Sequence, residues 1–318
     1  MMNQITLGIL TKDRSKQLTN CLNSIANQTI LPYEIIIIDN SKFQSAQKII
    51  KLFSNLPIKY FSYKYSTIPQ ARNQIIKICK TDYLGFVDDD CLLDKNWVKE
   101  ALFFIKNNHK FGYISGQNKL FNINNLFAQA QHYRQQYWFK YRYKQKIKQL
   151  DKFSLDSKNV ILNLKLMRSK KIKFDNQIFI NPIGDHADTD IGLQFHKHSL
   201  LGFYNSKMIV YHEDVNKFKK FIKKAYCRGR TGFLIYRKWK LTNELVFLPD
   251  YKIIKYIKRI KYWPVDFRKW LNIYHGNIFY KIIIFVLIKI YDWFYLKGFV
   301  DQAVQDKFQL NFLDKTDR

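Results

Sequence analysis

The sequence contains no glycine-rich phosphate loop. Neither G-x-x-x-x-G-K-[ST] nor G-x-G-x-x-G occurs among its 318 residues, and the first strand-like segment is followed instead by Thr11-Lys12-Asp13-Arg14. Such loops place backbone N–H groups around the phosphates of a bound nucleotide. Their absence argues against a dinucleotide-dependent oxidoreductase and, among enzymes that handle nucleoside phosphates, against a nucleotidyltransferase.

Cysteine is scarce. Cys21, Cys79, Cys91 and Cys227 are the four in the chain, and no two of them have C-x-x-C spacing. No secretory leader pattern precedes them, because the N-terminal residues enter directly into an apolar strand pattern. We therefore expect reduced thiols, a cytoplasmic location and no cysteine-bound metal.

The chain also lacks a long uninterrupted apolar run. The most apolar segment, Ile278 to Val300, is interrupted by Lys281, Lys289 and Asp292. Its uncharged stretch is far shorter than the roughly 20 residues that span a bilayer. The segment predicts either a helix lying in the interface of an anionic membrane or an ordinary packing helix, and the basic runs before it favour peripheral membrane contact.

Acidic residues are outnumbered. The chain has 54 Lys and Arg against 25 Asp and Glu, a formal net charge of +29. This excess favours polyanionic partners, namely nucleic acid, an anionic membrane surface or phosphorylated substrates. A nucleic-acid-binding protein stays an alternative, because aromatic and basic residues alternate in 132–143, but no nucleic-acid-binding motif accompanies them.

Apolar strand-like runs alternate with helix-period segments in the first 120 residues. The runs are ITLGIL, EIIIID, IKYFSYK, YLGFVD and GYISGQ, and amphipathic segments at Ser15 to Gln28 and Pro69 to Lys80 lie between them. This alternation is typical of a doubly wound α/β domain with a parallel sheet. EIIIID is apolar at four successive positions, as expected for a strand covered on both faces.

Polar side chains follow several of these strands, where open α/β sheets bind ligands. The sharpest group is Asp88-Asp89-Asp90. Alternation along an extended chain places Asp88 and Asp90 on one side, where a hard cation such as Mg²⁺ or Mn²⁺ would offset their repulsion. An acidic loop without a ligand is the plainer interpretation.

A second acidic group lies in GDHADTDIG from Gly184 to Gly192, and a strand-like KMIVYHED containing His212 follows it. Asp188 and Asp190 could alternatively be acids at a helix N-terminus, where the helix dipole favours them.

Together these motifs resemble the inverting family-two glycosyltransferases, which have the GT-A fold. ITLGILTKDR, IIIIDNS, QARN and FVDDD match in order, followed by Lys158-Asn159, FD at Phe174-Asp175, ADTDIGL and VYHED, so the resemblance covers roughly residues 4–235. It implies a nucleotide-sugar donor, expected to be a UDP-sugar, and a glycan or lipid-linked acceptor in the synthesis of cell-surface polysaccharide or glycoconjugate.

The resemblance also implies the roles of individual residues. Asp188 is the expected catalytic base, and Asp90 and His212 are the expected contacts of Mn²⁺ or Mg²⁺. Arg228 and Arg230 are expected to assist with phosphate. The residues assigned to the donor nucleotide and its diphosphate are Thr11, Asp13, Arg14, Asp39, Arg72, Asp88 and Asp89.

One position departs from the family pattern. Ala187 stands where the family usually has Glu, so the base role of Asp188 rests on its spacing to Asp190 and Gly192, and Asp185 is the second candidate. A family member without catalytic activity therefore stays an alternative.

The predicted organisation has two parts. Residues 1–235 form an α/β domain of GT-A type, Rossmann-like with a mostly parallel central sheet and flanking helices. Its nucleotide-binding half ends near residue 120, and the acceptor half covers 121–235. Residues 236–318 form a basic, amphipathic, helical C-terminal region.

Overall fold

The computed structural model describes residues 4–42, 45–64, 67–108, 110–142, 149–150, 155–180, 186–239 and 277–316. The chain divides into two compact units. The first contains residues 1–121, 145–176 and 187–213, and the second contains 122–144, 177–186 and 214–318. Each unit is therefore made of several segments that alternate along the chain. The domain boundary that we predicted at residue 235 stays a prediction.

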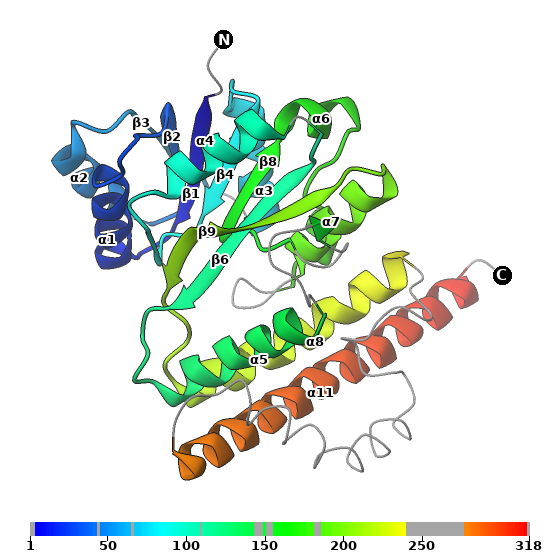
Figure 1. Ribbon diagram of the computed structural model, residues 1–318. Helices are drawn as coiled ribbons and strands as arrows, with labels where there is room; N and C mark the ends of the chain where they lie inside the picture. Colours follow the sequence, from blue (N-terminus) through cyan, green and yellow to red (C-terminus); the bar gives the residue numbers. More distant parts are fainter. Residues whose placement is uncertain are drawn as a thin grey trace. The chain divides into compact units, whose positions relative to one another are not determined.

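The first unit is built on one sheet (Figure 1). Its strand order is β3-β2-β1-β4-β8-β6-β9-β5, with β7 paired to β9. The strands are β1 (Ile5–Thr11), β2 (Glu34–Asp39), β3 (Ile58–Ser62), β4 (Tyr83–Val87), β5 (Cys91–Leu93), β6 (Tyr113–Leu120), β7 (Gln149–Leu150), β8 (Asn159–Asn163) and β9 (Gly202–His212). The helices are α1 (Ser15–Ala26), α2 (Ser45–Ile50), α3 (Ile68–Ile78), α4 (Trp97–Asn107), α6 (Leu164–Ser169) and α7 (Ala187–Lys197).

Strands β1 to β4 are mutually parallel, as predicted. Beyond β4 the sheet becomes mixed, because β8 pairs antiparallel with both β4 and β6, and β5 pairs antiparallel with β9. All six residues of β2 are buried, which confirms that EIIIID is an interior strand. The parallel pairing brings the carboxyl ends of β1, β2 and β4 to one edge of the sheet.

The crossover helices form where the apolar spacing predicted them. Helix α1 buries Leu18, Cys21, Leu22 and Ile25, the i, i+3, i+4, i+7 pattern of one helix face. Helix α3 begins after Thr67, whose hydroxyl accepts a hydrogen bond from the backbone N–H of Gln70 at 3.2 Å. Both helices thereby present polar residues of their first turns at the carboxyl edge of the sheet.

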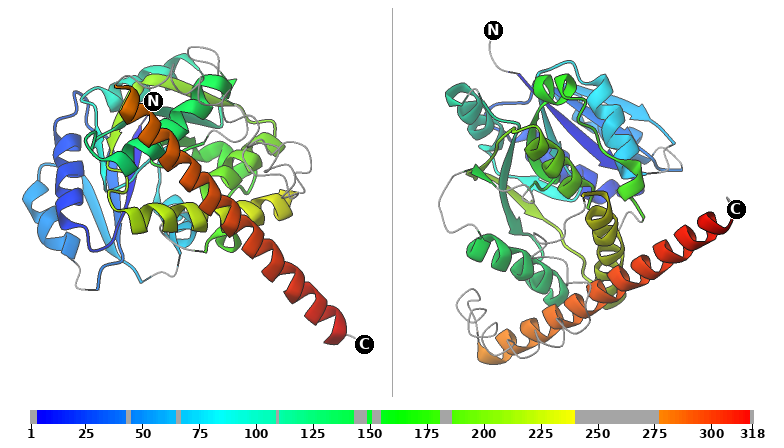
Figure 2. Two further views of the ribbon diagram at one scale, coloured as in Figure 1. Left: turned by 90° about the horizontal axis from the view of Figure 1, so that it is seen from below. Right: turned by 90° about the vertical axis from the view of Figure 1, so that its right-hand side faces the viewer.

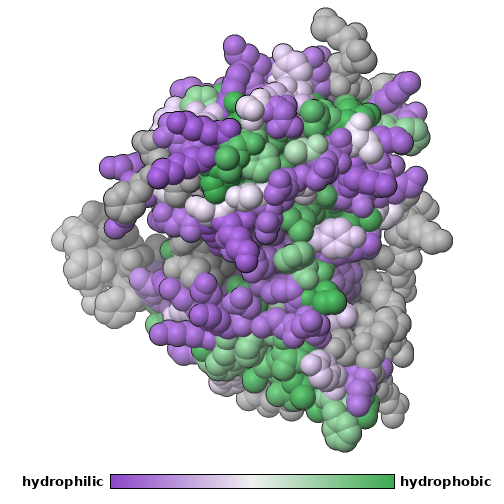
Figure 3. Space-filling view, turned by 90° about the vertical axis from the view of Figure 1, so that its left-hand side faces the viewer, coloured by the Kyte–Doolittle hydropathy of each residue, from purple (hydrophilic) through white to green (hydrophobic). Residues whose placement is uncertain are grey.

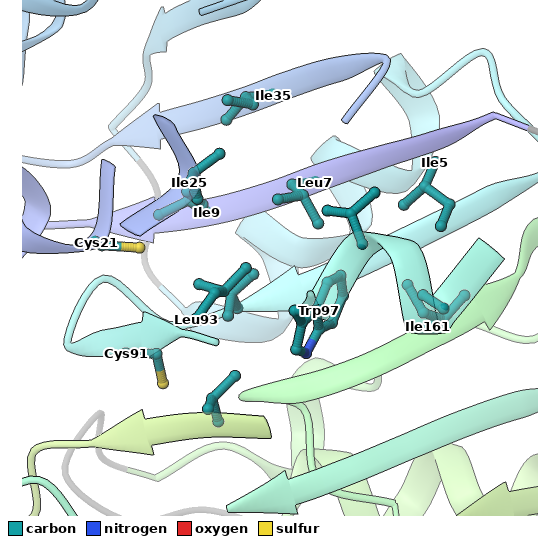
Figure 4. Packing of buried hydrophobic residues seen from close by; sticks show 14 of the residues in the cluster. Ile5, Leu7, Ile9, Cys21, Ile25, Ile35, Cys91, Leu93, Trp97 and Ile161 are labelled. Carbon is teal, nitrogen blue, oxygen red and sulfur yellow. The ribbon is translucent and has the colours of Figure 1, made fainter. Parts of the chain in front are cut away.

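The core of this unit lies between the sheet and its helices (Figure 4). Trp97 of α4 is fully buried and lies close to Leu7, Leu93 and Ile161. Its indole N–H donates to Asn159 Oδ1 at 2.8 Å. The amide of Asn159 in turn donates to backbone oxygens of β6 and β9, so this buried side chain ties three strands together. On the face shown in Figure 3, hydrophilic residues predominate and hydrophobic residues gather in patches among them.

The second unit is helical in the residues described. It contains α5 (Leu126–Arg142), α8 (Phe218–Trp239) and α11 (Ile278–Thr316), and α11 packs against the other two (Figures 1 and 2). The helical C-terminal appendage that we predicted is present as α11, while residues 240–276 of the predicted region lie outside the described part. Among the described helices, none is both long enough and apolar enough to cross a membrane.

Two glycines allow α8 and α11 to approach each other closely. A Cβ atom on Gly229 would lie 1.9 Å from the backbone oxygen of Tyr295, and one on Gly298 would lie 2.0 Å from that of Tyr226. Neither helix backbone could keep its position with a side chain at these sites. The pairing of the two helices thus depends on both glycines.

We expect Gly229→Ala to lower the free energy of unfolding by roughly 2 kcal/mol, the usual cost of overpacking. Helix propensity alone predicts the opposite sign, a gain of about 1 kcal/mol. Urea unfolding followed by circular dichroism measures the difference, with Val304→Ala on the exposed side of α11 as the control. A stabilised Gly229→Ala variant would contradict the close helix contact.

Candidate active site

Asp88, Asp89 and Asp90 directly follow β4, and the structure separates their environments. Asp89 is 3 % exposed. Its two oxygens accept from the Thr11 hydroxyl at 2.8 Å and from Arg14 Nη1 at 2.9 Å. Asp89 therefore acts on the site through Thr11 and Arg14, by holding the loop after β1 against the loop after β4.

Asp88 and Asp90 meet His212 at the end of β9. One ligand atom from each of the three residues lies within 4.8 Å of the others, and Nε2 of His212 is 3.4 Å from Asp90 Oδ1. Strand pairing produces this meeting, because Cys91 of β5 is in register with His212 of β9. Two carboxylates and one imidazole suit Mn²⁺ or Mg²⁺, so the residues present fit the predicted metal.

Two arginines border this group of acids. Arg14 Nη1 also lies 2.9 Å from Asp90 Oδ2, which makes it a bridge between Asp89 and Asp90. Arg72 Nη2 is 3.6 Å from Asp88 Oδ1. Both cations were predicted to be near the donor, and the structure places them beside the carboxylates.

Arg72 is held by aromatic side chains. Its guanidinium carbon lies 5.9 Å from the ring centre of Phe86 and 5.3 Å from that of Phe174. The Phe174 segment is fastened to α3, because Asn73 exchanges two hydrogen bonds with the backbone of Phe174 at 2.8 and 2.9 Å. This packing orients a buried arginine towards Asp88 and limits its conformational freedom.

Lys158 belongs to the Lys158-Asn159 pair that contributes to the family resemblance, but no role in the site was predicted for it. Val87 of β4 is in register with Asn159 of β8, so continuing the antiparallel ladder by one residue sets Lys158 opposite Asp88. The Lys158 ammonium group donates to Asp156, which also accepts from Asn118 Nδ2 at 2.8 Å. The side chain of Lys158 is 15 % exposed. Asp156 thus holds the Lys158 ammonium group in place, and the charge of Lys158 acts to lower the pKa of Asp88.

Burial and charge act in opposite directions on these carboxyl groups. Burial raises the pKa of Asp89 to about 7, against the lowering effect of the Arg14 charge. Burial likewise raises the pKa of Asp88, against the charges of Arg72, His212 and Lys158, although 40 % of the Asp88 side chain remains exposed. Burial therefore disfavours the charged form of both carboxyl groups more than the neighbouring cations favour it.

Asp39 lies at the end of the neighbouring strand β2 and is 1 % exposed. Its carboxylate accepts from the backbone N–H groups of Ser41 at 2.8 Å and Ala46 at 3.3 Å, and from the Tyr60 hydroxyl at 3.0 Å. The Ser41 hydroxyl accepts from the backbone N–H of Asp13 at 2.8 Å. Asp39 therefore shapes the loop that meets Asp13.

Asp13 has a positive φ of 54°. Asp tolerates this left-handed conformation better than most residues do, and such conformations cluster at functional sites. Asp13 and Asp39 follow adjacent strands, since Thr11 and Asp39 are in register. The structure brings these two predicted donor-binding residues together.

Asp188 lies in the first turn of α7 and is half-buried; its Oδ1 accepts from the backbone N–H of Thr189 at 2.8 Å. Asp190 is fully buried and accepts from Gln194 Nε2 at 2.7 Å, a contact within the same helix. Asp185, the second candidate for the base, lies outside the described residues.

Arg228 and Arg230 belong to the second unit. Arg230 donates to Gln302 at 2.8 Å and to Gln305 at 2.8 Å, which uses its guanidinium to fasten α8 to α11. Arg228 lies beside His186, where burial and then the charges of Arg228 and Arg134 lower the pKa of the imidazole. The expected role of the two arginines in phosphate binding stays a prediction.

The order of the strands and the grouping of the acids after β4 with His212 are consistent with a GT-A fold. Residues 6–167 match the model of glycosyl transferase family 2, and because this is half of the chain, the protein belongs to that family.

Among curated proteins, the chain is similar to the SPbeta prophage-derived glycosyltransferase SunS of Bacillus subtilis (strain 168). The two are 35 % identical over 92 residues, which is 29 % of this chain and 21 % of SunS. The chain thus matches only about a fifth of that relative's length.

Two solved structures extend the likeness to nearly the whole chain. TarS 1–349 of S. aureus in complex with UDP-GlcNAc has a TM-score of 0.52 at 13 % identity and covers 95 % of this chain and 92 % of that one. The mannosyltransferase PcManGT of Pyrobaculum calidifontis, in complex with GDP-Man and Mn²⁺, has a TM-score of 0.60 at 10 % identity and covers 97 % and 88 %. At such identities the likeness establishes the fold.

Proposed function

We propose that this protein is an inverting glycosyltransferase that transfers a sugar from a nucleotide-diphosphate sugar to a hydroxyl group of a glycan or lipid-linked acceptor. The observation that carries the proposal is the meeting of Asp88, Asp90 and His212 at the carboxyl edge of the parallel strands, with Arg14 and Arg72 beside them. Family membership adds support.

The donor is proposed to be a UDP-sugar. Asp39 and Asp13 build the loops for the nucleoside at the ends of β1 and β2, while Arg72 and Arg14 carry positive charge where a diphosphate would bind. Binding of UDP-GlcNAc by the TarS structure supports this choice of nucleotide. The pathway is proposed to be the synthesis of cell-surface polysaccharide or glycoconjugate.

Asp88, Asp90 and His212 would hold the Mn²⁺ or Mg²⁺ ion. When bound, such an ion stabilises the negative charge that develops on a leaving diphosphate, without a proton donor. Arg72 is held in place by Phe86 and Phe174 and adds a fixed charge at the same side of the site.

The chemical step is proposed to be a single displacement. The acceptor oxygen forms a bond to the anomeric carbon from the face opposite the diphosphate, and the bond from that carbon to the diphosphate oxygen breaks. The electron pair leaves with the diphosphate, and Asp188 receives the proton of the acceptor hydroxyl. The configuration at the anomeric carbon therefore inverts.

The enzyme is further proposed to work in the cytoplasm as a peripheral protein at the inner face of the membrane, where a lipid-linked acceptor would be reached. The net charge of +29 supports attraction to an anionic surface.

We expect purified protein to release nucleoside diphosphate from a UDP-sugar only in the presence of Mn²⁺ or Mg²⁺. A coupled assay over a panel of nucleotide sugars measures the release, and calorimetry with the same panel measures donor binding. Excess EDTA should abolish turnover, and added metal should restore it. If no nucleotide sugar binds and none is hydrolysed with either metal, the proposal is wrong; tight nucleic-acid binding at physiological salt would then favour the alternative class.

A further inference from the structure

An ion pair with little exposure lies at the start of β8. The side chains of Lys158 and Asp156 are 15 % and 14 % exposed, and the Lys158 ammonium group donates to Asp156 Oδ2. The Lys158 backbone N–H donates to Asp156 Oδ1 at 3.4 Å, and Asn118 Nδ2 donates to Asp156 Oδ2 at 2.8 Å. These contacts hold the ammonium group and limit its conformational freedom.

The pairing of β8 with β4 places this ion pair beside the acids. Val87 of β4 is opposite Asn159 of β8. One further step along the antiparallel ladder sets Lys158 opposite Asp88, and residues opposed in such a ladder carry their side chains on the same face of the sheet. A second contact fixes the same arrangement, because the thiol of Cys91, directly after the three acids, donates to the Lys158 carbonyl oxygen at 3.8 Å.

The charge of Lys158 acts on one of the proposed metal ligands. Together with Arg72, whose Nη2 is 3.6 Å from Asp88 Oδ1, it acts to lower the pKa of Asp88. A positive charge that favours a carboxylate over the carboxylic acid also repels a divalent cation from that carboxylate. Arg14, at 2.9 Å from Asp90 Oδ2, adds to the repulsion. These three cations therefore weaken the hold of the acids on a metal ion alone.

A diphosphate changes this balance. Its negative charges cancel those of a divalent ion, so the neighbouring cations do not repel the complex of the two. We propose that Lys158, held by Asp156, makes the site select a metal ion bound to the donor diphosphate over a metal ion alone. Lys158 is thus a positioning residue that acts through Asp88. The proposal rests on the proposed function, since it needs a nucleotide-diphosphate donor and a metal at Asp88, Asp90 and His212.

The two members of the ion pair separate this electrostatic role from a purely structural one. If the pair only fastens the start of β8, the loss of either member loosens the site, and both losses weaken metal binding. If the charge of Lys158 opposes the metal, the two losses have opposite signs. Lys158→Gln then removes a repelling charge, whereas Asp156→Asn leaves that charge uncompensated.

Binding of Mn²⁺ to the full chain tests the proposal without turnover. The electron paramagnetic resonance signal of Mn²⁺ in solution falls when the ion binds and thus measures its affinity. Lys158→Gln should tighten the binding of Mn²⁺ alone about 10-fold, and Asp156→Asn should weaken it about 3- to 10-fold. Calorimetry with an equimolar mixture of Mn²⁺ and UDP should show no tighter binding of the complex to Lys158→Gln than to the wild type.

Lys165→Gln is the matched control. Lys165 is exposed in α6, which follows the end of β8 that is far from the acids, since Asn163 pairs with Tyr83 at the start of β4. The same change of charge there should leave both affinities unaltered. If Lys158→Gln does not fold, the double variant Lys158→Gln, Asp156→Asn takes its place. This double variant should bind Mn²⁺ about 10-fold more tightly than Asp156→Asn does.

Three results would contradict the role of Lys158. Unchanged Mn²⁺ affinity in Lys158→Gln would do so, as would weaker binding in both single variants or equal binding by Asp156→Asn and the double variant. If the wild type binds Mn²⁺ and UDP normally in these cases, the selection of the metal–diphosphate complex by Lys158 alone is wrong. If the wild type binds neither Mn²⁺ nor a nucleotide sugar, the proposed function is wrong, and the role of Lys158 with it.

Discussion

Asp88→Asn and Asp90→Asn are each expected to lower turnover about 1,000-fold, because loss of a metal-binding carboxylate removes several kcal/mol of transition-state stabilisation. Both carboxylates lie within 4.8 Å of a His212 nitrogen, so either change removes one of three grouped ligand atoms. The amide is uncharged and binds a hard cation weakly. Steady-state rates as a function of Mn²⁺ concentration measure the effect, and the concentration of metal needed for half-maximal rate should rise as well.

Asp82→Asn is the matched control for this pair of variants. Asp82 is exposed and precedes the same strand, β4, at the end away from the site. The same change of charge there should leave the rate and the metal requirement unaltered. Full turnover in both Asp88→Asn and Asp90→Asn would contradict the metal assignment, and equal losses in Asp82→Asn would point to a general effect of net charge.

Asp89 illustrates why three adjacent acids should not respond alike. Its carboxylate accepts hydrogen bonds from Thr11 and Arg14 and is nearly inaccessible to solvent. By contrast, 40 % of the Asp88 side chain is exposed. The alternation of an extended chain predicts this division from the sequence alone. The partners of Asp89 could not be predicted, because they depend on how the loops after β1 and β4 fold against each other.

The parallel half of the sheet was predictable because its signals are local. Strands β1, β2 and β4 are short apolar runs, and α1 and α3 have apolar residues at helical spacing. The insertion of β8 between β4 and β6 was not predicted. Its sequence, NVILN, is as apolar as its neighbours, and its antiparallel direction is decided by pairings with distant strands rather than by its own pattern.

The difference between local signals and long-range pairing also explains which site residues could be predicted from the sequence. Thr11, Asp39 and Asp88 end apolar strands, and this position is visible in the sequence. Lys158 reaches the site only through the register of β8 with β4. The contact of Arg72 with Phe174 joins residues about a hundred positions apart, so neither spacing nor composition could indicate it.

Asp188→Asn is expected to lower kcat by about 100- to 10,000-fold, the usual contribution of a general base, and to leave donor affinity unchanged. Asp188 lies in the first turn of α7 and is only partly buried. The amide keeps the size and the ability to accept from Thr189 but cannot take up a proton. Calorimetric donor binding and initial rates at saturating donor separate the two quantities.

Asp190→Asn distinguishes chemistry from helix structure at this segment. Asp190 is fully buried and accepts from Gln194 within α7, so its substitution should lower the unfolding temperature more than Asp188→Asn does. An undiminished kcat in Asp188→Asn would show that Asp188 is not the general base, and Asp185 would become the candidate for that role. Undiminished rates in both Asp188→Asn and Asp185→Asn would exclude these two residues as the base. Asp190 would then be the last carboxylate of the GDHADTD segment that could accept the proton. In that case Asp190→Asn would lose activity without losing donor binding.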